Sequence, residues 1–354
     1  MQQEPGKRAE TKPSKAPVFA VAPMIDWTDR HCRFFHRQLS ERAVLYTEMV
    51  VADAILYGPR ERLLGHDAAE HPVVLQLGGS NPQKLVEAVR IAADFAYDEI
   101  NLNVGCPSDR VQSGTFGACL MKTPDLVAEC VSAMKAVSSV PVTVKCRIGV
   151  DDQQPEKVLP AFVAQMADAG ADAVWIHARK AWLQGLSPKE NRDIPPLDYD
   201  LVHAVKREFP NLFIGINGGI ADLSQALQHL NHVDGVMLGR AAYQNAGLLA
   251  EVDHRIHGAP WQAPDWQALC ETMMAYAERV MASGGRLNHV TRHMVGLFQG
   301  FAGARRYRQI LSSEATKPGI DPELIARAFA AVDIAGGPTR VTDSAARADM
   351  AVSA

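Results

Sequence analysis

The sequence lacks any apolar run of the ~18 residues that a membrane-spanning helix needs. Its six cysteines, at positions 32, 106, 119, 130, 146 and 270, include no CxxC pair. That spacing predicts neither a zinc site nor a disulfide framework, and it is typical of proteins from a reducing cytosol. Residues 1–16 carry charges and prolines where a signal peptide would carry an apolar run. We therefore expect a cytoplasmic, monomeric protein without a membrane anchor or a metal.

An excess of charge of one sign is also missing, because 36 basic residues stand against 40 acidic ones. A role in nucleic-acid binding must then depend on a local basic patch. Such a patch exists between Arg286 and Ser313, where five arginines and two histidines occur without an acidic residue. The chain has 354 residues and is 47% hydrophobic, which is enough for one large domain and a smaller one.

Short apolar segments alternate with amphipathic ones over most of the chain. Strands are predicted at 18–24, 45–50, 73–79, 99–106, 141–149, 173–179, 212–219 and 235–240, and helices at 81–95, 124–138, 155–169, 199–209 and 222–230. This alternation predicts a parallel (β/α)₈ barrel over residues 17–258, close to the usual ~250 residues of that fold. A doubly wound sheet is the alternative, which the absence of GxGxxG after the first strand disfavours.

The pattern changes after Gly258. Four segments, 265–283, 287–298, 303–312 and 321–334, have helical periodicity, and no strand is predicted among them. We interpret residues 259–335 as a small all-helical domain, residues 1–16 as a disordered leader and residues 336–354 as a disordered tail.

The stretch from Glu99 to Met121 is a candidate catalytic segment. It begins as a strand and breaks at Gly105-Cys106-Pro107. Proline removes a backbone donor and favours extended geometry before it, so Cys106 should lie on a loop at the end of a strand. Catalytic groups of α/β enzymes occupy such positions. A buried structural cysteine is the other interpretation, and this stretch alone does not separate the two.

Polar side chains near the carboxyl ends of five predicted strands indicate a ligand site. Buried parallel strands are normally apolar, and a buried polar group without a partner is costly. The period of two places Lys145 and Arg147 on one face and Cys146 on the other. The hydrogen-bonding groups of these side chains must be satisfied either by a polar ligand or by one another. The side chains are Gln76, Asn101, Asn103, Lys145, Arg147, His177, Arg179 and Asn217.

Glycine pairs at the ends of strands seven and eight point to a phosphate. Asn217-Gly218-Gly219 and Gly239-Arg240 follow these strands, where barrels often hold phosphate groups. With a bare phosphate substrate, Lys145 could form a Schiff base. With flavin mononucleotide (FMN), Gln76 and Lys145 could contact the ring, and the backbone of 22–24 could line it. Spacing leaves both alternatives open.

Several motifs together resemble one family. They are AVAPMIDWTDRHCR (20–33), LQLGGSNP (75–82), INLNVGCPSDRVQSGTFGACLM (100–121), VKCRIGVDD (144–152), HARKAWLQGLSPKENRDIPPL (177–197), GINGGI (215–220) and VMLGRAAY (236–243). The chain resembles the flavin-dependent tRNA-dihydrouridine synthases over about residues 17–335. HARKAWLQGLSPKENR and LFQGFAGARRYRQ resemble subfamily A, which modifies positions 20 and 20a of the D-loop.

The resemblance implies a chemistry and a set of site residues. In that family FMN is reduced by NADPH and passes hydride to C6 of a flipped uridine, while the strand-four cysteine, here Cys106, donates a proton to C5. Ordinary thiols titrate near pH ~8.5, so a cysteine has a proton to give at neutral pH. The implied FMN contacts are Pro23, Met24, Ile25, Gln76, Lys145, His177, Asn217, Gly218, Gly219, Gly239 and Arg240. The implied tRNA contacts are Asn103, Lys189, Arg192, Arg305 and Arg308.

The basic patch can also be interpreted without the resemblance. On the predicted helix 303–312, Arg305 and Arg308 share a solvent face, and Arg306 points to another side. The apolar stripe of that helix consists of Ala304, Tyr307, Ile310 and Leu311. Two alternative functions remain: an FMN barrel oxidoreductase of a small molecule, similar to dihydroorotate dehydrogenase, and a non-enzymatic tRNA-binding protein.

Overall fold

The computed structural model describes residues 16–108 and 116–338. Eight parallel strands follow one another around a closed barrel, and β1 pairs with β8 to close it. The strands are β1 (Val18–Val21), β2 (Val44–Val51), β3 (Val73–Gly78), β4 (Glu99–Val104), β5 (Val142–Arg147), β6 (Ala173–His177), β7 (Phe213–Asn217) and β8 (Gly235–Leu238). The predicted (β/α)₈ barrel is confirmed, and the doubly wound sheet is wrong. The expected leader and tail lie outside the described residues, apart from residues 16 and 336–338.

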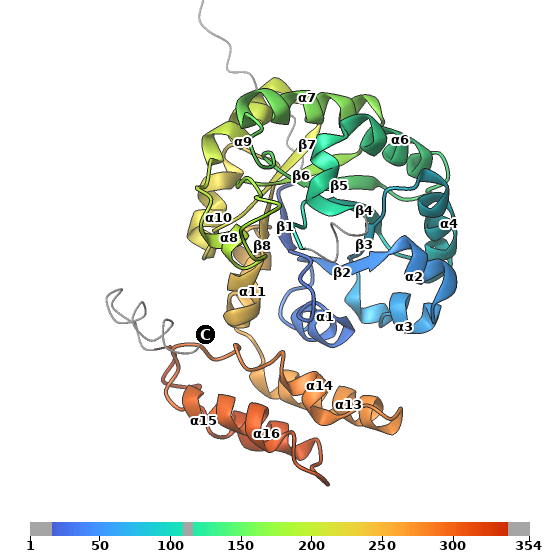
Figure 1. Ribbon diagram of the computed structural model, residues 1–354. Coiled ribbons are helices and arrows are strands. Elements are labelled where there is room, and N and C mark those ends of the chain that lie inside the picture. The colour runs from blue at the N-terminus through green and yellow to red at the C-terminus, as the bar shows by residue number, and fades with distance from the viewer. Residues whose placement is uncertain (1–15, 109–115, 339–354) are drawn as a thin grey trace, which may run out of the picture.

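Helices form the outer layer of the barrel (Figure 1). They are α1 (Arg30–Arg37), α2 (Ala52–Tyr57), α3 (Arg60–Leu64), α4 (Pro82–Ala92), α6 (Pro124–Lys135), α7 (Pro155–Asp168), α8 (Glu190–Asp193), α9 (Tyr199–Glu208), α10 (Leu223–Leu230), α11 (Arg240–Gln244) and α12 (Val252–Arg255). Short 3₁₀ helices occupy Ala68–Glu70, Ala93–Phe95, Gly117–Lys122 and Ala246–Glu251. Asn81, Asp198 and Asp222 start α4, α9 and α10 by accepting backbone N–H bonds on their side chains.

The barrel interior is filled below its carboxyl end. Trp175, Tyr46 and Met237 are buried together inside the barrel. A Cβ at Gly215 would lie 2.1 Å from the Trp175 ring, so only glycine leaves room for the indole there. Cys146 faces the opposite way and packs with the strand–helix core, as the period of two predicts. This filling confines a ligand site to the carboxyl end of the strands.

The chain after α12 is helical. Its elements are α13 (Trp266–Ala282), α14 (Leu287–Thr291), α15 (Ala304–Gln309), a π-helical turn at Ile310–Glu314 and α16 (Glu323–Phe329). The prediction of a helix over 287–298 is wrong beyond Thr291, because the chain continues in turns. A Cβ at Gly296 would lie 2.5 Å from the Gln244 carbonyl oxygen, so the backbone here packs directly on α11.

The helical segment packs on the barrel through α1, as Figure 1 shows. Phe34 of α1 stacks on Tyr276 of α13 with ring centroids 3.9 Å apart. Phe35 of α1 is buried in the same apolar core as the helical segment. Asp29, the cap of α1, also accepts from Arg292 at 2.6 Å and from His293 at 3.0 Å. We refer to these contacts as the α1 joint.

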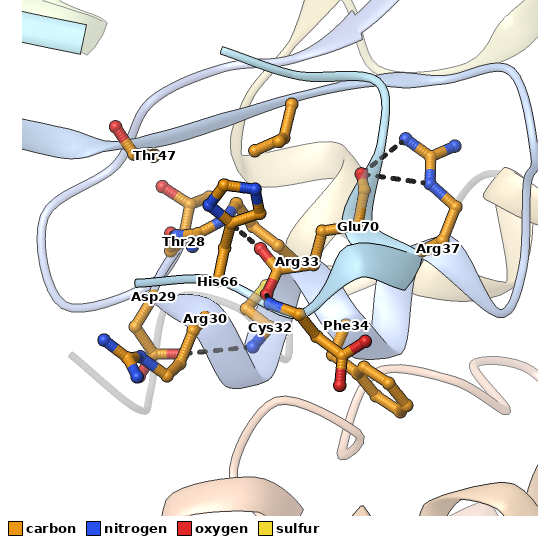
Figure 2. Close-up of polar contacts among 12 residues, drawn as sticks. Thr28, Asp29, Arg30, Cys32, Arg33, Phe34, Arg37, Thr47, His66 and Glu70 are labelled. Atoms are coloured by element: carbon orange, nitrogen blue, oxygen red, sulfur yellow. Dashed lines mark hydrogen bonds and ion pairs between the residues drawn. The ribbon is translucent and has the colours of Figure 1, made fainter. Parts of the chain in front are cut away.

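Buried ion pairing fixes α1 on the barrel in turn. Arg33 Nε lies 2.6 Å from a Glu70 carboxylate oxygen, and both side chains are buried. Arg37 donates to the Glu70 backbone oxygen, as Figure 2 shows, and to the carbonyl oxygens of Ser40 and Ala43. The helix that carries the joint therefore cannot shift without breaking buried charged hydrogen bonds.

Candidate active site

Cys106 lies two residues beyond the end of β4, on a loop, as predicted. The Asn103 side-chain oxygen accepts from the backbone N–H groups of Gly105 and Cys106, both at 3.0 Å. The Cys106 carbonyl oxygen accepts from Ala118 N–H at 2.9 Å. The thiol is half-buried and lies 3.6 Å from the Ser108 hydroxyl. The backbone around this thiol is therefore held on both sides.

Arg147 connects the Cys106 loop to the segment after β6. Its guanidinium donates to the carbonyl oxygens of Gly105 at 2.9 Å, Lys180 at 3.0 Å and Asn191 at 3.0 Å. Burial lowers the pKa of Arg147 to about 10. Because the donors of this buried cation bond to backbone carbonyl oxygens, Arg147 positions the backbone and does not pair with a carboxylate. The sequence placed Arg147 in the polar set but gave it no role, because its partners are far apart in the chain.

One part of the polar set satisfies itself. Asn103 donates to Gln76, Gln76 to Asn101 and Asn101 to Thr143, each at 2.8 Å. Thr143 in turn donates to Glu99. These side chains, apart from Glu99, are buried. Among the described residues, Gln76 and Asn103 each use one side-chain N–H in this chain of hydrogen bonds. Gln76 was predicted to contact FMN and Asn103 to contact tRNA, and these remain predictions.

The other part of the set keeps unused hydrogen-bonding capacity. The Lys145 ammonium, with three donors, has one hydrogen bond in the described part of the chain, 3.0 Å to the Asn217 side-chain oxygen. Asn217 also donates to the Met237 carbonyl oxygen at 2.7 Å. His177 Nε2 is buried and has no partner among the described residues. Buried groups of this kind usually mark a ligand, a water or an ion.

Burial and mutual repulsion control protonation in this part. Burial, and then Arg147, lower the pKa of Lys145 to about 8. Burial holds the pKa of His177 well below its usual value, and the neighbouring Arg147 and Lys145 add to that effect. His177 is therefore neutral at physiological pH, with one ring nitrogen free to donate or accept. An acceptor-rich or anionic ligand suits this arrangement.

The predicted phosphate glycines border the same groups. Gly218 and Gly219 have φ angles of +112° and +69°, which disfavour any side chain. A Cβ on Gly218 would meet the His177 ring at 2.6 Å, whereas one on Gly239 would meet nothing closer than Met24 Sδ at 3.6 Å. Gly239 and Met24 are thus neighbours at the closing strands. Donors beside glycine backbone have the chemistry that a phosphorylated ligand requires, and the assignment of these residues to FMN remains a prediction.

Arg240 is less available than predicted. Its guanidinium pairs with Asp193 of α8 at 2.7 Å. A phosphate bound by Arg240 would therefore share it with a carboxylate. Pro23, Met24 and Ile25 follow β1, and Ile25 is 54% exposed; their contact with the flavin ring remains a prediction.

The predicted tRNA contacts fall in two places. Lys189 and Arg192 are exposed at α8, in the segment that follows β6. Arg305 and Arg308 are exposed on α15, whereas Ala304 and Tyr307 of α15 and Ile310 and Leu311 of the following π-helical turn are buried, as the periodicity predicts. Neither arginine has an ion-pair partner among the described residues, whereas Arg306 pairs with Glu314 at 2.8 Å.

No group of three or more histidine, cysteine or acidic side chains in the described ranges is arranged to hold a metal ion. Within those ranges, no helix has both the length and the apolar character to span a bilayer.

Comparison with known proteins then identifies the family. The family model "Dihydrouridine synthase (Dus)" matches residues 20–331. The chain belongs to the dihydrouridine synthase family. The tRNA-dihydrouridine(20/20a) synthase of Vibrio cholerae is 55% identical to it over 314 residues, covering 88% of this chain and 96% of the relative. Those of Shewanella oneidensis and Escherichia coli strain K12 are 56% and 54% identical, covering 89% and 88% of this chain and 94% and 90% of the relatives.

A structural comparison matches morphinone reductase with a TM-score of 0.49 and 14% identity, over 72% of this chain and 88% of that chain. This likeness adds nothing to the family assignment.

Two residues of this synthase-family site escaped the sequence reasoning. Asn191 is fully buried, and its side chain both donates to the Trp182 carbonyl oxygen and accepts from the Trp182 N–H. Asp193 pairs with Arg240. Asn191 stands in the segment that resembles subfamily A and Asp193 directly follows it, but nothing in their spacing distinguishes a backbone support from a surface residue.

Proposed function

We propose that this chain reduces uridines at positions 20 and 20a of the tRNA D-loop to 5,6-dihydrouridine, with FMN as cofactor and NADPH as reductant. The observation that carries the proposal is the juxtaposition at one barrel end of a supported thiol, Cys106, with the Lys145 ammonium and the His177 ring, which have one partner and none, respectively, for Nζ and Nε2 among the described residues. The family match and the names of the relatives support the substrate. They leave the two alternatives, a small-molecule oxidoreductase and a non-enzymatic tRNA-binding protein, without support.

The residues of the chain divide the work. Cys106 gives its proton to C5 of the uracil ring, and Arg147 and Asn103 keep the Cys106 backbone in position. Lys145, His177 and Asn217 hold the flavin ring and ribityl portion, and Gly218, Gly219, Gly239 and Arg240 its phosphate. When bound, FMN supplies the hydride for C6. Because C5 and C6 are hidden in a stacked helix or loop, the uridine must be turned out of its stack.

The tRNA contacts two regions in this proposal. Lys189 and Arg192 follow β6, at the carboxyl end of the barrel formed by residues 17–258. Arg305 and Arg308 lie in the helical domain of residues 259–335. One RNA that contacts both would bring its D-loop to Cys106. We further propose that the protein acts in the cytoplasm as a monomer.

The direct test uses tRNA that lacks dihydrouridine. Purified protein with NADPH should form dihydrouridine at positions 20 and 20a, and heat should release FMN from the protein. Wild-type protein that contains FMN but leaves the tRNA unchanged would overturn the proposed activity. Protein that contains FAD, or no flavin after expression with ample riboflavin, would overturn the cofactor assignment.

The two-region contact has a separate test. The variant Arg305→Ala/Arg308→Ala should bind tRNA more weakly, with a slope of log affinity against log salt shallower by up to about one unit per lost phosphate contact. NADPH oxidation without tRNA should not change. Arg306→Ala is the matched control, because Arg306 is already paired with Glu314. Wild-type affinity and slope in the double variant would show that this face does not bind RNA.

A further inference from the structure

Exposed apolar side chains gather at the carboxyl end of the barrel. Ile25 follows β1, and Trp182 and Ile194 follow β6; they are 54%, 39% and 60% exposed. Trp182 is the largest of the three and carries an extended flat ring. The Lys180 ammonium lies 5.2 Å from the centroid of that ring. The contact with this cation is a favourable cation–π interaction, and it leaves 39% of the tryptophan exposed.

The indole is exposed but its backbone is held firmly. Trp182 N–H donates to the Asn191 side-chain oxygen at 2.7 Å, and the Asn191 amide donates back to the Trp182 carbonyl oxygen at 2.9 Å. On one side, Ala181 N–H donates to the Gly149 carbonyl oxygen at 3.0 Å. On the other, Leu183 N–H donates to the Asp151 carboxylate at 2.8 Å. The ring is thus presented on a fixed support, which lowers the entropy lost when something stacks on it.

The same segment borders Cys106. Arg147 binds the Lys180 carbonyl oxygen and the Gly105 carbonyl oxygen at once, so the residues just before Trp182 and Cys106 share one guanidinium. Lys189 and Arg192 are exposed farther along this segment. A flat apolar surface flanked by cations, beside the reacting thiol, matches the chemistry of an unstacked nucleobase with its phosphates.

We propose that Trp182 is a stacking platform for a base of the tRNA loop that flanks the reacting uridine. The inference rests on the proposed function and adds a substrate-positioning residue to it. When the uridine leaves the stack, its neighbour loses a stacking partner. The indole replaces that partner, and the Lys180 ammonium lies 5.2 Å from the centroid of the same ring. Stacking does not depend on the identity of the base, so this contact adds affinity and orientation without reading sequence.

The first test compares Trp182→Ala with Trp182→Phe. Loss of the ring should raise the KM for tRNA by about 10-fold or more, as expected for removal of one base–aromatic stack, while phenylalanine should restore most of the affinity. The slope of log affinity against log salt should stay as in wild type, because no phosphate contact is lost. Flavin content and NADPH oxidation without tRNA should also be unchanged.

Trp261→Ala is the matched control. Trp261 is 51% exposed, and its ring lies 5.6 Å from that of His254. Asp253, which precedes His254 in the chain, accepts a hydrogen bond from Ser40, and Ser40 lies shortly before the amino end of β2. Trp261 therefore stands at the opposite end of the barrel from Cys106, and its loss should leave the KM for tRNA unchanged.

The decisive test removes the base instead of the ring. Synthetic tRNAs with a single abasic residue, either 5′ or 3′ of the reacting uridine, are measured with wild type and Trp182→Ala. At one of the two positions the abasic tRNA should weaken wild-type binding about as much as Trp182→Ala does, and the two changes together should cost no more than either alone.

The outcomes separate this inference from the proposed function. Fully additive losses at both abasic positions, or a wild-type KM in Trp182→Ala, would overturn the stacking role while the wild-type enzyme still forms dihydrouridine. Equal loss of flavin in the alanine and phenylalanine variants would assign the indole a structural role and also overturn it. Absence of dihydrouridine with wild type would instead overturn the proposed function.

Discussion

The polar residues at the mouth of the barrel divide into two halves that differ in their hydrogen bonding. In the closed half, Asn103, Gln76, Asn101 and Thr143 form a continuous chain in which each side chain donates to the next. In the open half, Lys145 has one acceptor, and His177 Nε2 has no partner among the described residues. The difference teaches that a buried polar side chain indicates a ligand only after its partners have been counted.

The largest expected effect concerns Cys106, whose backbone is attached to the closed half through Asn103. Cys106→Ala should retain FMN and its reduction by NADPH, but uridine reduction should fall by ~10²–10⁴-fold, the usual contribution of a general acid. Single-turnover assays with pre-reduced enzyme measure the second half-reaction alone. Cys119→Ala is the control and should be much milder. Normal dihydrouridine formation by Cys106→Ala would remove the thiol from the mechanism.

The second prediction is that substitutions in the two halves change the stability of the flavin-free protein in opposite directions. Lys145→Met removes a buried, underused cation of the open half, so flavin retention should fall while the flavin-free protein becomes more stable. The pKa of Lys145 is lowered to about 8 from its usual 10.5, so below pH 8 its burial costs roughly 3 kcal/mol of stability. Chemical denaturation of flavin-free protein checks the stability change, and heat-released FMN checks retention.

The pH dependence of Lys145 supplies the control. Between about pH 8 and 10.5 the unfolded chain binds more protons at this lysine than the folded one. The stability of flavin-free wild type should therefore rise with pH across that window relative to Lys145→Met, and the gap between the two should close. A parallel pH dependence would show that the ammonium is satisfied, and the distinction between the halves would fail.

A smaller effect is expected in the closed half. Asn101→Leu keeps the volume of the side chain but leaves a Gln76 N–H and the Thr143 hydroxyl without Asn101 as partner. The unfolding free energy should decrease by about 1–3 kcal/mol, because a buried group is left unpaired. Denaturation of the flavin-free and flavin-loaded proteins should give similar losses. A loss confined to the loaded protein would mean that this half also binds the ligand.

The sequence predicted the positions of many residues of this site but not their hydrogen-bond and ion-pair partners. The period of two placed Lys145 and Arg147 on one face and Cys146 on the other correctly, since strand geometry depends only on neighbouring residues. Partners could not be predicted in the same way. Arg147 bonds to Gly105, Lys180 and Asn191, and these contacts arise only when the loop after β4 and the segment after β6 meet at the end of β5. Arg240 was assigned to phosphate, yet nothing local indicated its ion pair with Asp193.

The helical segment shows the same limit. Its apolar stripe on α15 was predicted from spacing alone and is buried as expected. The end of α14 at Thr291 was not predicted, because the turns after it depend on the packing of Gly296 on the Gln244 backbone. The Asp29–Arg292 pair joins residues 263 positions apart and leaves no sequence signature.

The α1 joint bears on how the molecule melts. Phe34 and Phe35 belong to the barrel helix α1 but to the apolar core of the helical segment. Neither region can lose its structure without exposing rings that the other covers, and Asp29 would lose Arg292 and His293 at the same moment. Calorimetry should then record one heat-absorption peak for the whole chain rather than two. In the cell the barrel and the helical segment would therefore unfold together, and no folded barrel without the helical segment would accumulate as a protease-resistant intermediate.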